Sequence, residues 1–268
     1  MHDLWEGKSH SNNGANLSNL LTLARDLKRR KARERRSLFV AEGIRCVEEL
    51  LGSKLDIQGS IVSPQIAGAE RGQALIAALR ERGVEMQEVS EKEFESAAET
   101  DSPQGILAIA KTPRYGTERL SAENVRLIVL DAVQDPGNVG TIVRTAAGLG
   151  ADATLALPGT VDFWNAKVVR SSMGAQFHHP VISVTDEELA NLLRRERIEL
   201  WAADAGGEPL ALQPPPKKLA IAVGNEGAGL SSIVRGLANR IVSLPIRGQV
   251  ESLNVAVAAG IILYELNK

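Results

Sequence analysis

The chain has 268 residues, of which 44% are hydrophobic and 24% are charged, and its formal net charge is -2. These values are typical of a globular protein with a sizeable core, and the length favours two domains. The single cysteine, Cys46, excludes an internal disulfide and a zinc site built on several cysteines, and aromatic residues at 3% are too scarce for a stacking platform that binds single-stranded nucleic acid.

No part of the sequence indicates a membrane or a secreted protein. No run approaches the roughly 20 apolar residues of a membrane span. The N-terminus lacks the succession of charged, apolar and small residues that marks a signal peptide. We therefore expect a cytoplasmic protein without a membrane partner.

The N-terminal segment is polar at first and then strongly basic. Residues 1–15 are aperiodic, which predicts a disordered tail, and residues 16–36 predict one helix with an apolar stripe. Between Arg25 and Arg36 there are eight basic and two acidic residues. This charge density favours contact with RNA phosphates, although a solvated helix face is an equally good interpretation. The residues that we expect to contact RNA are Arg29, Arg30, Arg33 and Arg36, together with Arg247 near the C-terminus.

Strands and helices alternate along the rest of the chain. Four predicted strands lie between residues 38 and 111, and with the basic helix they form a small α/β domain, residues 16–111. Residues 112–124 carry Pro, Gly and charge without periodicity, which predicts a linker. About six further strands alternate with helices in residues 125–268, and the last two, residues 219–225 and 240–246, are apolar and β-branched throughout. This pattern predicts a parallel sheet covered by helices on both faces. One of these helices is expected over residues 164–177.

Several motifs of nucleotide and metal binding are absent from the sequence. The turn after residues 126–133 lacks the GxGxxG spacing that positions a pyrophosphate on a helix. The segment Gly224–Gly229 is rich in glycine but lacks the Lys-Ser/Thr of a phosphate loop. His178 and His179 are adjacent, so in a strand they point to opposite faces and are poorly placed to share a metal. We therefore expect no metal site.

Polar residues follow the predicted strands at the edge where open α/β sheets bind ligands. The set comprises Asn138, Arg144, Glu226, Ser252 and Asn254. Four of these five residues have a structural alternative. Glu226 and Ser252 could cap helices, Asn254 could be a first-turn residue, and Arg144 could be solvated or paired with a carboxylate.

Arg144 is the most informative residue of this set. On a helix it points away from the apolar stripe that includes Val139 and Val143, and its own face carries only small residues. These small residues are Gly140, Thr141, Ala147 and Gly148. Another surface could therefore approach the guanidinium closely.

Three segments of the chain carry a family resemblance. They are residues 135–146 (DPGNVGTIVRTA), 223–230 (VGNEGAGL) and 244–256 (LPIRGQVESLNVA). Together they resemble the SpoU (TrmH-type) family of RNA 2'-O-ribose methyltransferases, which belongs to the SPOUT superfamily of knotted α/β methyltransferases. Residues 17–111 are similar, more weakly, to the ribosomal-protein-like substrate-binding domain that often precedes this catalytic domain. That similarity is carried by the basic helix, by Phe39–Gly43 and by Ser102–Ile106.

The resemblance implies a deep trefoil knot in residues 218–268 and S-adenosylmethionine (AdoMet) as the methyl donor. Gly224, Leu244 and Leu253 match the cofactor contacts of the family, with Ile246 and Ala203 adjacent to them. A glycine at a strand end lets backbone groups approach a ligand, and leucines can form an apolar wall around an adenine. These expectations agree with the pattern of the residues.

The resemblance also implies catalytic roles. It places Arg144 near the cofactor of the neighbouring subunit. Because arginine is almost never deprotonated in proteins, we interpret Arg144 as holding a phosphate or the developing alkoxide, and its action as a base stays the alternative. Ser252 and Asn254 would orient the ribose and the cofactor, and Glu226 and Asn138 would hold the other groups in place. The family acts as homodimers through the closing helix, residues 255–266 here, which is apolar nearly all round as a buried interface helix should be.

The leading hypothesis is AdoMet-dependent methylation of a ribose 2'-hydroxyl. Because an accessory N-terminal domain is present, 23S ribosomal RNA is the expected substrate, with transfer RNA as the alternative within the class. A non-catalytic RNA-binding or assembly factor is the alternative from another class, but decay would be expected to remove some of the five polar site residues. Base methylation, known in the wider superfamily, is disfavoured by Arg144 together with Ser252-Leu253-Asn254.

Overall fold

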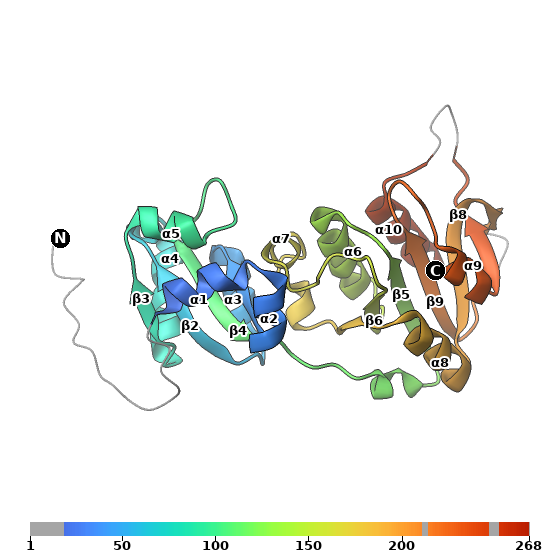
Figure 1. Cartoon of the computed structure of the whole chain (residues 1–268), viewed down its shortest axis with the longest axis horizontal. Coiled ribbons are helices and arrows are strands. Elements are labelled where there is room, and N and C mark those ends of the chain that lie inside the picture. Colours follow the sequence, from blue (N-terminus) through green and yellow to red (C-terminus); the bar gives the residue numbers. More distant parts are fainter. Residues whose placement is uncertain (1–18, 211–213, 247–251, 268) are drawn as a thin grey trace.

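The structure, a computed structural model, describes residues 19–210, 214–246 and 252–267. The predicted tail, residues 1–15, lies outside this part. Two sheets follow each other along the longest axis of the molecule, and helices cover both faces of each sheet (Figure 1). This arrangement confirms the predicted α/β fold with a smaller N-terminal sheet before a parallel sheet.

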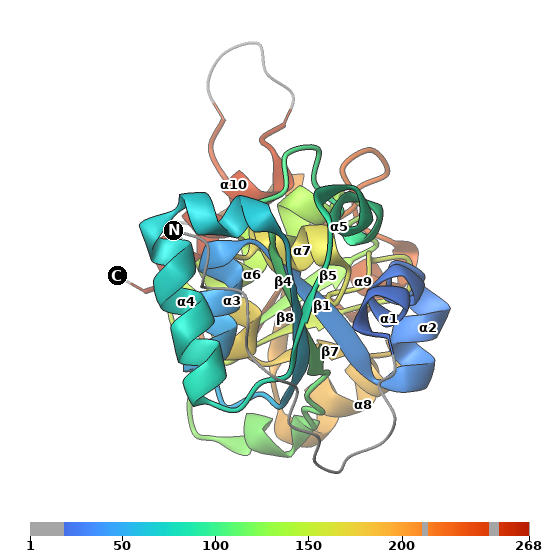
Figure 2. The ribbon, with the colours of Figure 1, turned by 90° about the vertical axis from the view of Figure 1, so that its left-hand side faces the viewer.

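The first sheet has four strands in the order β1-β4-β2-β3. They are β1 (Leu38–Glu42), β2 (Ile57–Val62), β3 (Met86–Glu88) and β4 (Ile106–Lys111). Strand β4 is antiparallel to both of its neighbours, whereas β2 and β3 are parallel. Figure 2 shows α3 (Ile44–Gly52) and α4 (Glu70–Glu81) on one face, and α1 (Leu20–Leu27), α2 (Arg30–Arg36) and α5 (Glu91–Ala97) on the other. The short 3-10 helix η1 (Pro64–Gly68) precedes α4.

The core of the first sheet contains the only cysteine of the chain. Cys46 packs with the aliphatic residues of α3 and α4, and burial raises the pKa of its thiol to about 12. A thiol with so high a pKa is protonated at neutral pH and is a poor nucleophile. Cys46 is therefore a core residue.

The predicted helix over residues 16–36 is instead two helices, α1 and α2. The chain between them is extended at Arg29, with φ -86° and ψ 129°. The Arg33 guanidinium donates hydrogen bonds to the carbonyl oxygens of Leu27 and Lys28, both at 2.8 Å. These carbonyls lie at the end of α1, where helix carbonyls lack intrahelical partners, so Arg33 stabilises the break. Periodicity alone could not reveal a break that depends on a side chain from the next helix.

The second sheet has six strands, all parallel, in the order β10-β8-β9-β5-β6-β7. They are β5 (Val125–Asp131), β6 (Ala153–Ala156), β7 (Val181–Ser183), β8 (Glu199–Pro209), β9 (Lys218–Gly224) and β10 (Arg240–Ser243). The near-continuous burial of the inner strands β5, β6 and β9 confirms the prediction of a sheet covered on both faces. The helices that cover it are α6 (Pro136–Gly148), α7 (Ala166–Ser171), α8 (Asp186–Glu196), α9 (Ser232–Leu237) and α10 (Val255–Leu266).

The helix predicted over residues 164–177 ends early. It is divided into α7 and the 3-10 helix η3 (Ala175–Phe177), because Met173 and Gly174 have φ angles of 55° and 79°. A Cβ on Gly174 would lie 2.7 Å from the Cβ of Glu49 on α3. A residue with a side chain would therefore not fit between the two helices, and its backbone would be strained.

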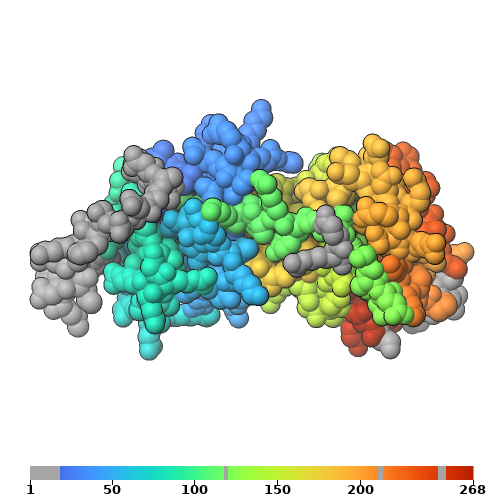
Figure 3. All heavy atoms as spheres, turned by 90° about the horizontal axis from the view of Figure 1, so that it is seen from below, coloured from blue at the N-terminus to red at the C-terminus, as the bar shows by residue number. Residues whose placement is uncertain are grey.

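The segment between the two sheets is not structureless. Figure 3 shows it crossing one face of the molecule, and residues Thr117–Ser121 form the 3-10 helix η2. Leu120 is buried among residues of the second sheet. The division of the chain into domains at residues 112–124 stays a prediction. The trefoil knot predicted in residues 218–268 also stays a prediction, since residues 247–251 lie outside the described part. No helix within the described ranges is long and apolar enough to cross a membrane.

The buried His179 predicts a pH dependence of stability. Burial lowers its pKa from 6.5 to about 4, and its Nε2 lies 2.9 Å from the Thr154 hydroxyl oxygen. Since the unfolded chain binds the proton first, stability is complete above pH 6.5 and falls as the pH drops toward 4, by up to about 3 kcal/mol. Denaturant unfolding measured from pH 7 to pH 4 should show that the free energy of unfolding falls less steeply with decreasing pH in His179→Gln than in the wild type. His178→Gln, at the exposed neighbouring position, is the control. If the pH dependence of stability is unchanged in His179→Gln but reduced in His178→Gln, the assignment to His179 is wrong.

Candidate functional site

A cavity of about 450 Å³ opens at the carboxyl ends of the strands in the second sheet. Its walls come from the ends of β8, β9 and β10 and from the start of α10. The volume lies in the usual range for small-molecule sites, and the position is where open parallel sheets bind ligands. The lining residues are Ala203, Asp204, Ala205, Val223, Gly224, Asn225, Glu226, Gly227, Gly229, Val242, Ser243, Leu244, Ile246, Ser252, Leu253, Asn254, Val255, Ala258 and Ile262.

A chain of hydrogen bonds at this edge connects the turn after β9 with the starts of α6 and α10. The Asn138 side-chain amide donates to Glu226 Oε1 at 3.0 Å, and its carbonyl oxygen accepts from Asn254 Nδ2 at 3.0 Å. The Asn254 carbonyl oxygen in turn accepts from the backbone N–H groups of Ala256 and Val257 in the first turn of α10. Asn254, rather than Ser252, is therefore the N-cap of α10. Three of the five polar residues singled out from the sequence thus form one network.

The Glu226 carboxylate is held in its charged form. Burial alone would raise its pKa, but hydrogen bonds from the Asn138 side chain and from backbone N–H groups, including those of Gln134 and Asp135, together lower the pKa below the usual value. Each donor favours the ionised oxygen over the protonated one. Glu226 is therefore an acceptor at neutral pH, and it fixes the first turn of α6, which carries Asn138.

The turn after β9 is closed by its own backbone. Asn225 and Gly229 exchange two hydrogen bonds, at 2.9 and 3.0 Å, and the Asn225 side chain donates to the Ala132 carbonyl at 2.8 Å. Asp131, at the end of β5, accepts from the Ser231 N–H at 2.6 Å. The loops after β5 and β9 are thus held together without the contribution of a ligand.

Gly224 lies where two backbone segments come too close for a side chain. A Cβ at this position would be 2.4 Å from the carbonyl carbon of Gly229 and 2.7 Å from the Leu230 nitrogen. We expect Gly224→Ala to lower the free energy of unfolding by about 1–3 kcal/mol, because the backbone of the turn must shift. Gly227→Ala is the matched control, since its Cβ would have no neighbour nearer than Asn225 Oδ1 at 3.7 Å. Equal stability of both variants in denaturant unfolding would show that the close approach is not maintained in solution.

The structure gathers the expected cofactor contacts. All five, namely Ala203, Gly224, Leu244, Ile246 and Leu253, line the cavity, as do Glu226, Ser252 and Asn254. Asp204 also lines it and was missed by the sequence reasoning. Hydrogen bonding from the Gly206 N–H and, to a smaller extent, pairing with Arg235 lower its pKa, so Asp204 lines this wall as a carboxylate in an ion pair with Arg235. The polar stretch that ends β8 was the available signal for Asp204.

Arg144 is not part of the cavity of its own chain. It is exposed on α6, and within the described ranges its guanidinium has no hydrogen-bond or ion-pair partner. One of the small residues predicted to leave its face open is covered, because Gly140 packs against α7, where a Cβ would lie 1.9 Å from Ser171 Oγ. Thr141 and Gly148 are exposed, so part of the predicted open face remains.

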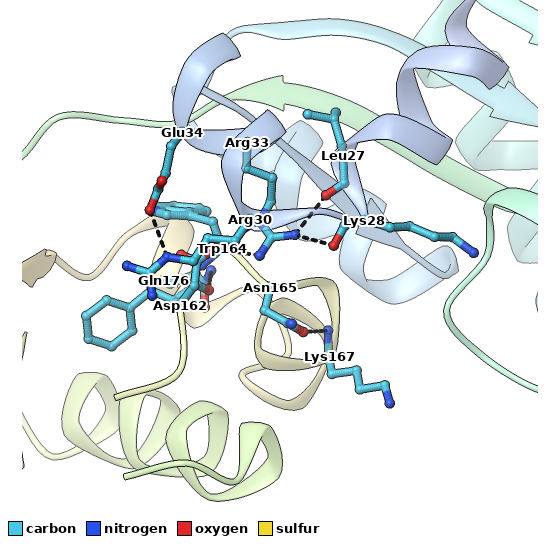
Figure 4. A network of polar contacts seen from close by, with 11 residues as sticks. Leu27, Lys28, Arg30, Arg33, Glu34, Asp162, Trp164, Asn165, Lys167 and Gln176 are labelled. Atoms are coloured by element: carbon cyan, nitrogen blue, oxygen red, sulfur yellow. Dashed lines mark hydrogen bonds and ion pairs between the residues drawn. The ribbon is translucent and has the colours of Figure 1, made fainter. Parts of the chain in front are cut away.

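The predicted RNA-binding arginines differ in exposure. Arg29, Arg30 and Arg36 are exposed on or near α2. Arg33 is not available to a phosphate, because its side chain is only 7% exposed and pairs with Asp162 at 2.7 Å (Figure 4). Asp162 follows β6 in the second sheet, so Arg33 connects the two sheets instead. Arg247 lies outside the described residues.

No group of three or more His, Cys, Asp or Glu side chains that could hold a metal ion occurs among the residues that the structure describes.

Comparison with known proteins gives matches over both parts of the chain. Residues 126–264 match the SpoU rRNA Methylase family, and residues 22–108 match the MRM3-like substrate binding domain. The chain is 35% identical over 238 residues to the 23S rRNA (guanosine(2553)-2'-O)-methyltransferase RlmP of Bacillus subtilis, covering 88% of this chain and 91% of that protein.

Two further comparisons cover most of the chain. It is 35% identical over 204 residues to the 23S rRNA (guanosine-2'-O-)-methyltransferase RlmB of Pectobacterium atrosepticum, covering 73% of this chain and 83% of that protein. Among solved structures it is similar to the SpoU methyltransferase AviRb of Streptomyces viridochromogenes in complex with AdoMet, with a TM-score of 0.84 and 26% identity over 92% of this chain and 96% of that one.

Proposed function

The chain belongs to the SpoU rRNA Methylase family, and from this premise we propose that it transfers a methyl group from AdoMet to a ribose 2'-hydroxyl of 23S rRNA. The observation that carries the proposal is the cavity at the strand ends, with the Glu226–Asn138–Asn254 network on its wall. Relatives with the printed activity match over both sheets, so the whole chain takes part in the proposed function.

The cavity residues fit AdoMet. Leu244, Ile246 and Leu253 offer an apolar wall for the adenine, and the backbone at Gly224 is open to a polar ring edge. The Glu226 carboxylate favours a ligand that carries a positive charge. When bound there, AdoMet supplies an electrophilic methyl group on a sulfonium.

The remaining site residues position the ribose. We place Ser252 and Asn254, at the start of α10, beside the sugar, with Asn254 oriented by Asn138. Arg144 holds the attacking 2'-oxygen or a flanking phosphate as a permanent cation, which lowers the energy of the oxyanion as its proton leaves to solvent. Arg144 does not line the cavity of its own chain, and we place it beside the cavity of a second chain, as the family resemblance implies.

A homodimer is therefore part of the proposal. Val257, Ile261 and Tyr264 follow at spacings of four and three residues on α10, and they are 52%, 39% and 57% exposed. They form an apolar stripe on the side of the helix opposite the buried Ala259 and Ile262. A second copy of the chain would cover this stripe. A sedimentation experiment that finds only monomers at micromolar concentration would contradict the homodimer.

The first sheet is proposed as the RNA-substrate domain, residues 16–111, joined by residues 112–124 to the catalytic domain. Arg29, Arg35 and Arg36 share the single carboxylate of Asp26, so this surface keeps a positive excess. Such an excess attracts a polyanion. For a protein that methylates ribosomal RNA we propose a cytoplasmic location.

Incubation with methyl-labelled AdoMet and RNA from cells that lack the protein tests the proposal. After digestion to nucleosides, the label should be found on the ribose of one 23S rRNA nucleotide. Label in a base would contradict the 2'-O assignment, and label only in tRNA would move the substrate to the alternative class. If no RNA is labelled and calorimetry detects no AdoMet binding, the chain is a binding or assembly factor.

A further inference from the structure

Helix α7 belongs to the cores of both sheets. Val168 packs into the cluster of the second sheet, and the adjacent Val169 packs into the cluster of the first. Just before the helix, the ring of Trp164 lies 4.5 Å from the ring of Phe39 on β1. The position of α7 is therefore fixed relative to both the basic helix α2 and the catalytic sheet.

The exposed face of α7 carries two cations that have no structural role. Lys167 and Arg170 are exposed, and in the part of the chain that the structure describes neither side chain has a hydrogen-bond or ion-pair partner. They are three residues apart, so they lie on neighbouring positions of one helix surface. Arg33 also lies at the junction where the two sheets meet, but its charge is neutralised by Asp162.

The same face of α7 contacts the first turn of α6, which carries Asn138. The Ser171 hydroxyl donates to the Pro136 carbonyl at 2.9 Å, and Ser171 lies one helical turn after Lys167. A phosphate bound to Lys167 or Arg170 would thus be held beside the start of α6, which also carries Arg144.

The part of this junction that belongs to the first sheet also carries a positive charge. Lys28, at the break between α1 and α2, is held by a hydrogen bond from its ammonium to the Ala98 carbonyl at 2.7 Å. Figure 4 shows the side chains of Lys28 and Lys167 extending to the same side of the junction. Lys28, Asn165 and Glu99 surround a narrow cleft there, so one carboxylate also lies close to this surface.

We propose that Lys167 and Arg170 bind backbone phosphates of the substrate RNA as it passes from the basic surface of α2 to the methyl-transfer site. The inference rests on the proposed function and adds a contact surface on the catalytic side of the junction. Two cations on a fixed helix would hold the RNA in one register without reading its bases. They act on the binding of RNA and not on the reacting atoms.

The double variant Lys167→Gln/Arg170→Gln tests this proposal. Binding of a 23S rRNA transcript should weaken by about tenfold at moderate salt. The slope of log affinity against log salt should become less negative by about two, one for each lost phosphate contact. KM for the RNA should rise by a similar factor, whereas kcat and the affinity for AdoMet should stay within about twofold.

The matched control is Arg80→Gln/Arg194→Gln, which removes the same charge from α4 and α8, helices that Figure 2 shows away from α7. An equal loss of RNA affinity in this control would show that the effect comes from net charge alone, and it would overturn the proposal. Unchanged RNA affinity and salt slope in the α7 variant would also overturn it, as would a loss of kcat at unchanged KM. Wild-type protein that methylates 23S rRNA in the same assay separates these outcomes from a failure of the proposed function.

Discussion

Replacing Arg144 by alanine is expected to lower kcat for methyl transfer to 23S rRNA by on the order of 10²–10³, the usual effect of removing one group that stabilises an oxyanion. AdoMet affinity should stay within about twofold, because Arg144 does not line the cavity of its own chain and a truncated partner arginine leaves the apolar wall intact. Stability should also be preserved, since the exposed guanidinium has no partner within the described ranges.

The conservative variant separates charge from geometry at this position. Arg144→Lys keeps the positive charge but loses the planar fork, so it should recover only part of kcat if two hydrogen bonds are needed. Arg194→Ala, an exposed arginine on α8, is the control and should retain wild-type turnover. Wild-type kcat in Arg144→Ala would remove Arg144 from the mechanism.

Arg33→Ala is expected to lower the free energy of unfolding by about 3–5 kcal/mol, because it leaves the Asp162 carboxylate in a largely buried position without its cation. Arg33 donates two hydrogen bonds to Asp162, at 2.7 and 2.8 Å, and two to carbonyls at the end of α1. Asp162 is 17% exposed, so water can replace only a small part of these contacts. Denaturant unfolding measures the loss directly.

A double-mutant cycle isolates the pair. The double variant Arg33→Met/Asp162→Asn should lose less stability than the sum of the losses in Arg33→Met and in Asp162→Asn, because neither partner is then left as an unpaired buried charge. Arg30→Ala is the control, since its pair with Glu34 is exposed on both sides and should contribute less than about 0.5 kcal/mol. A cost below about 1 kcal/mol for Arg33→Ala would show that the contact between the sheets is weak in solution.

The sequence predicted the parts of the fold that depend on local pattern. Strands β5 and β9 are apolar at nearly every position, and a parallel strand with both faces covered has this pattern. The cavity residues were found because parallel strands end at one edge, so polar and glycine residues after β9 and β10 must meet there. The family resemblance then gave Leu244, Ile246 and Leu253 a role that their residue type alone does not indicate.

What escaped prediction depends on contacts between distant residues. The break between α1 and α2 is stabilised by Arg33, whose partner Asp162 is 129 residues away in the sequence. Because of this contact Arg33 is buried and connects the two sheets, and it is not the RNA ligand that we expected. It nevertheless belongs to the same basic run as Arg30 and Arg36. The bond between Asn138 and Asn254 spans 116 residues, and local spacing does not show that one amide orients the other.

Mixing two inactive variants tests most directly whether a cavity in one chain works with Arg144 of another. Arg144→Ala keeps its cavity, and Leu253→Arg places a cation at the cavity wall, at a position that is 37% exposed and should tolerate it. In co-expressed, doubly tagged heterodimers one of the two sites would have both an intact cavity and an intact arginine. We predict roughly a quarter of the wild-type activity from a random mixture, in which half the dimers are mixed. Purified mixed dimers that stay as inactive as either parent would contradict a site shared between subunits.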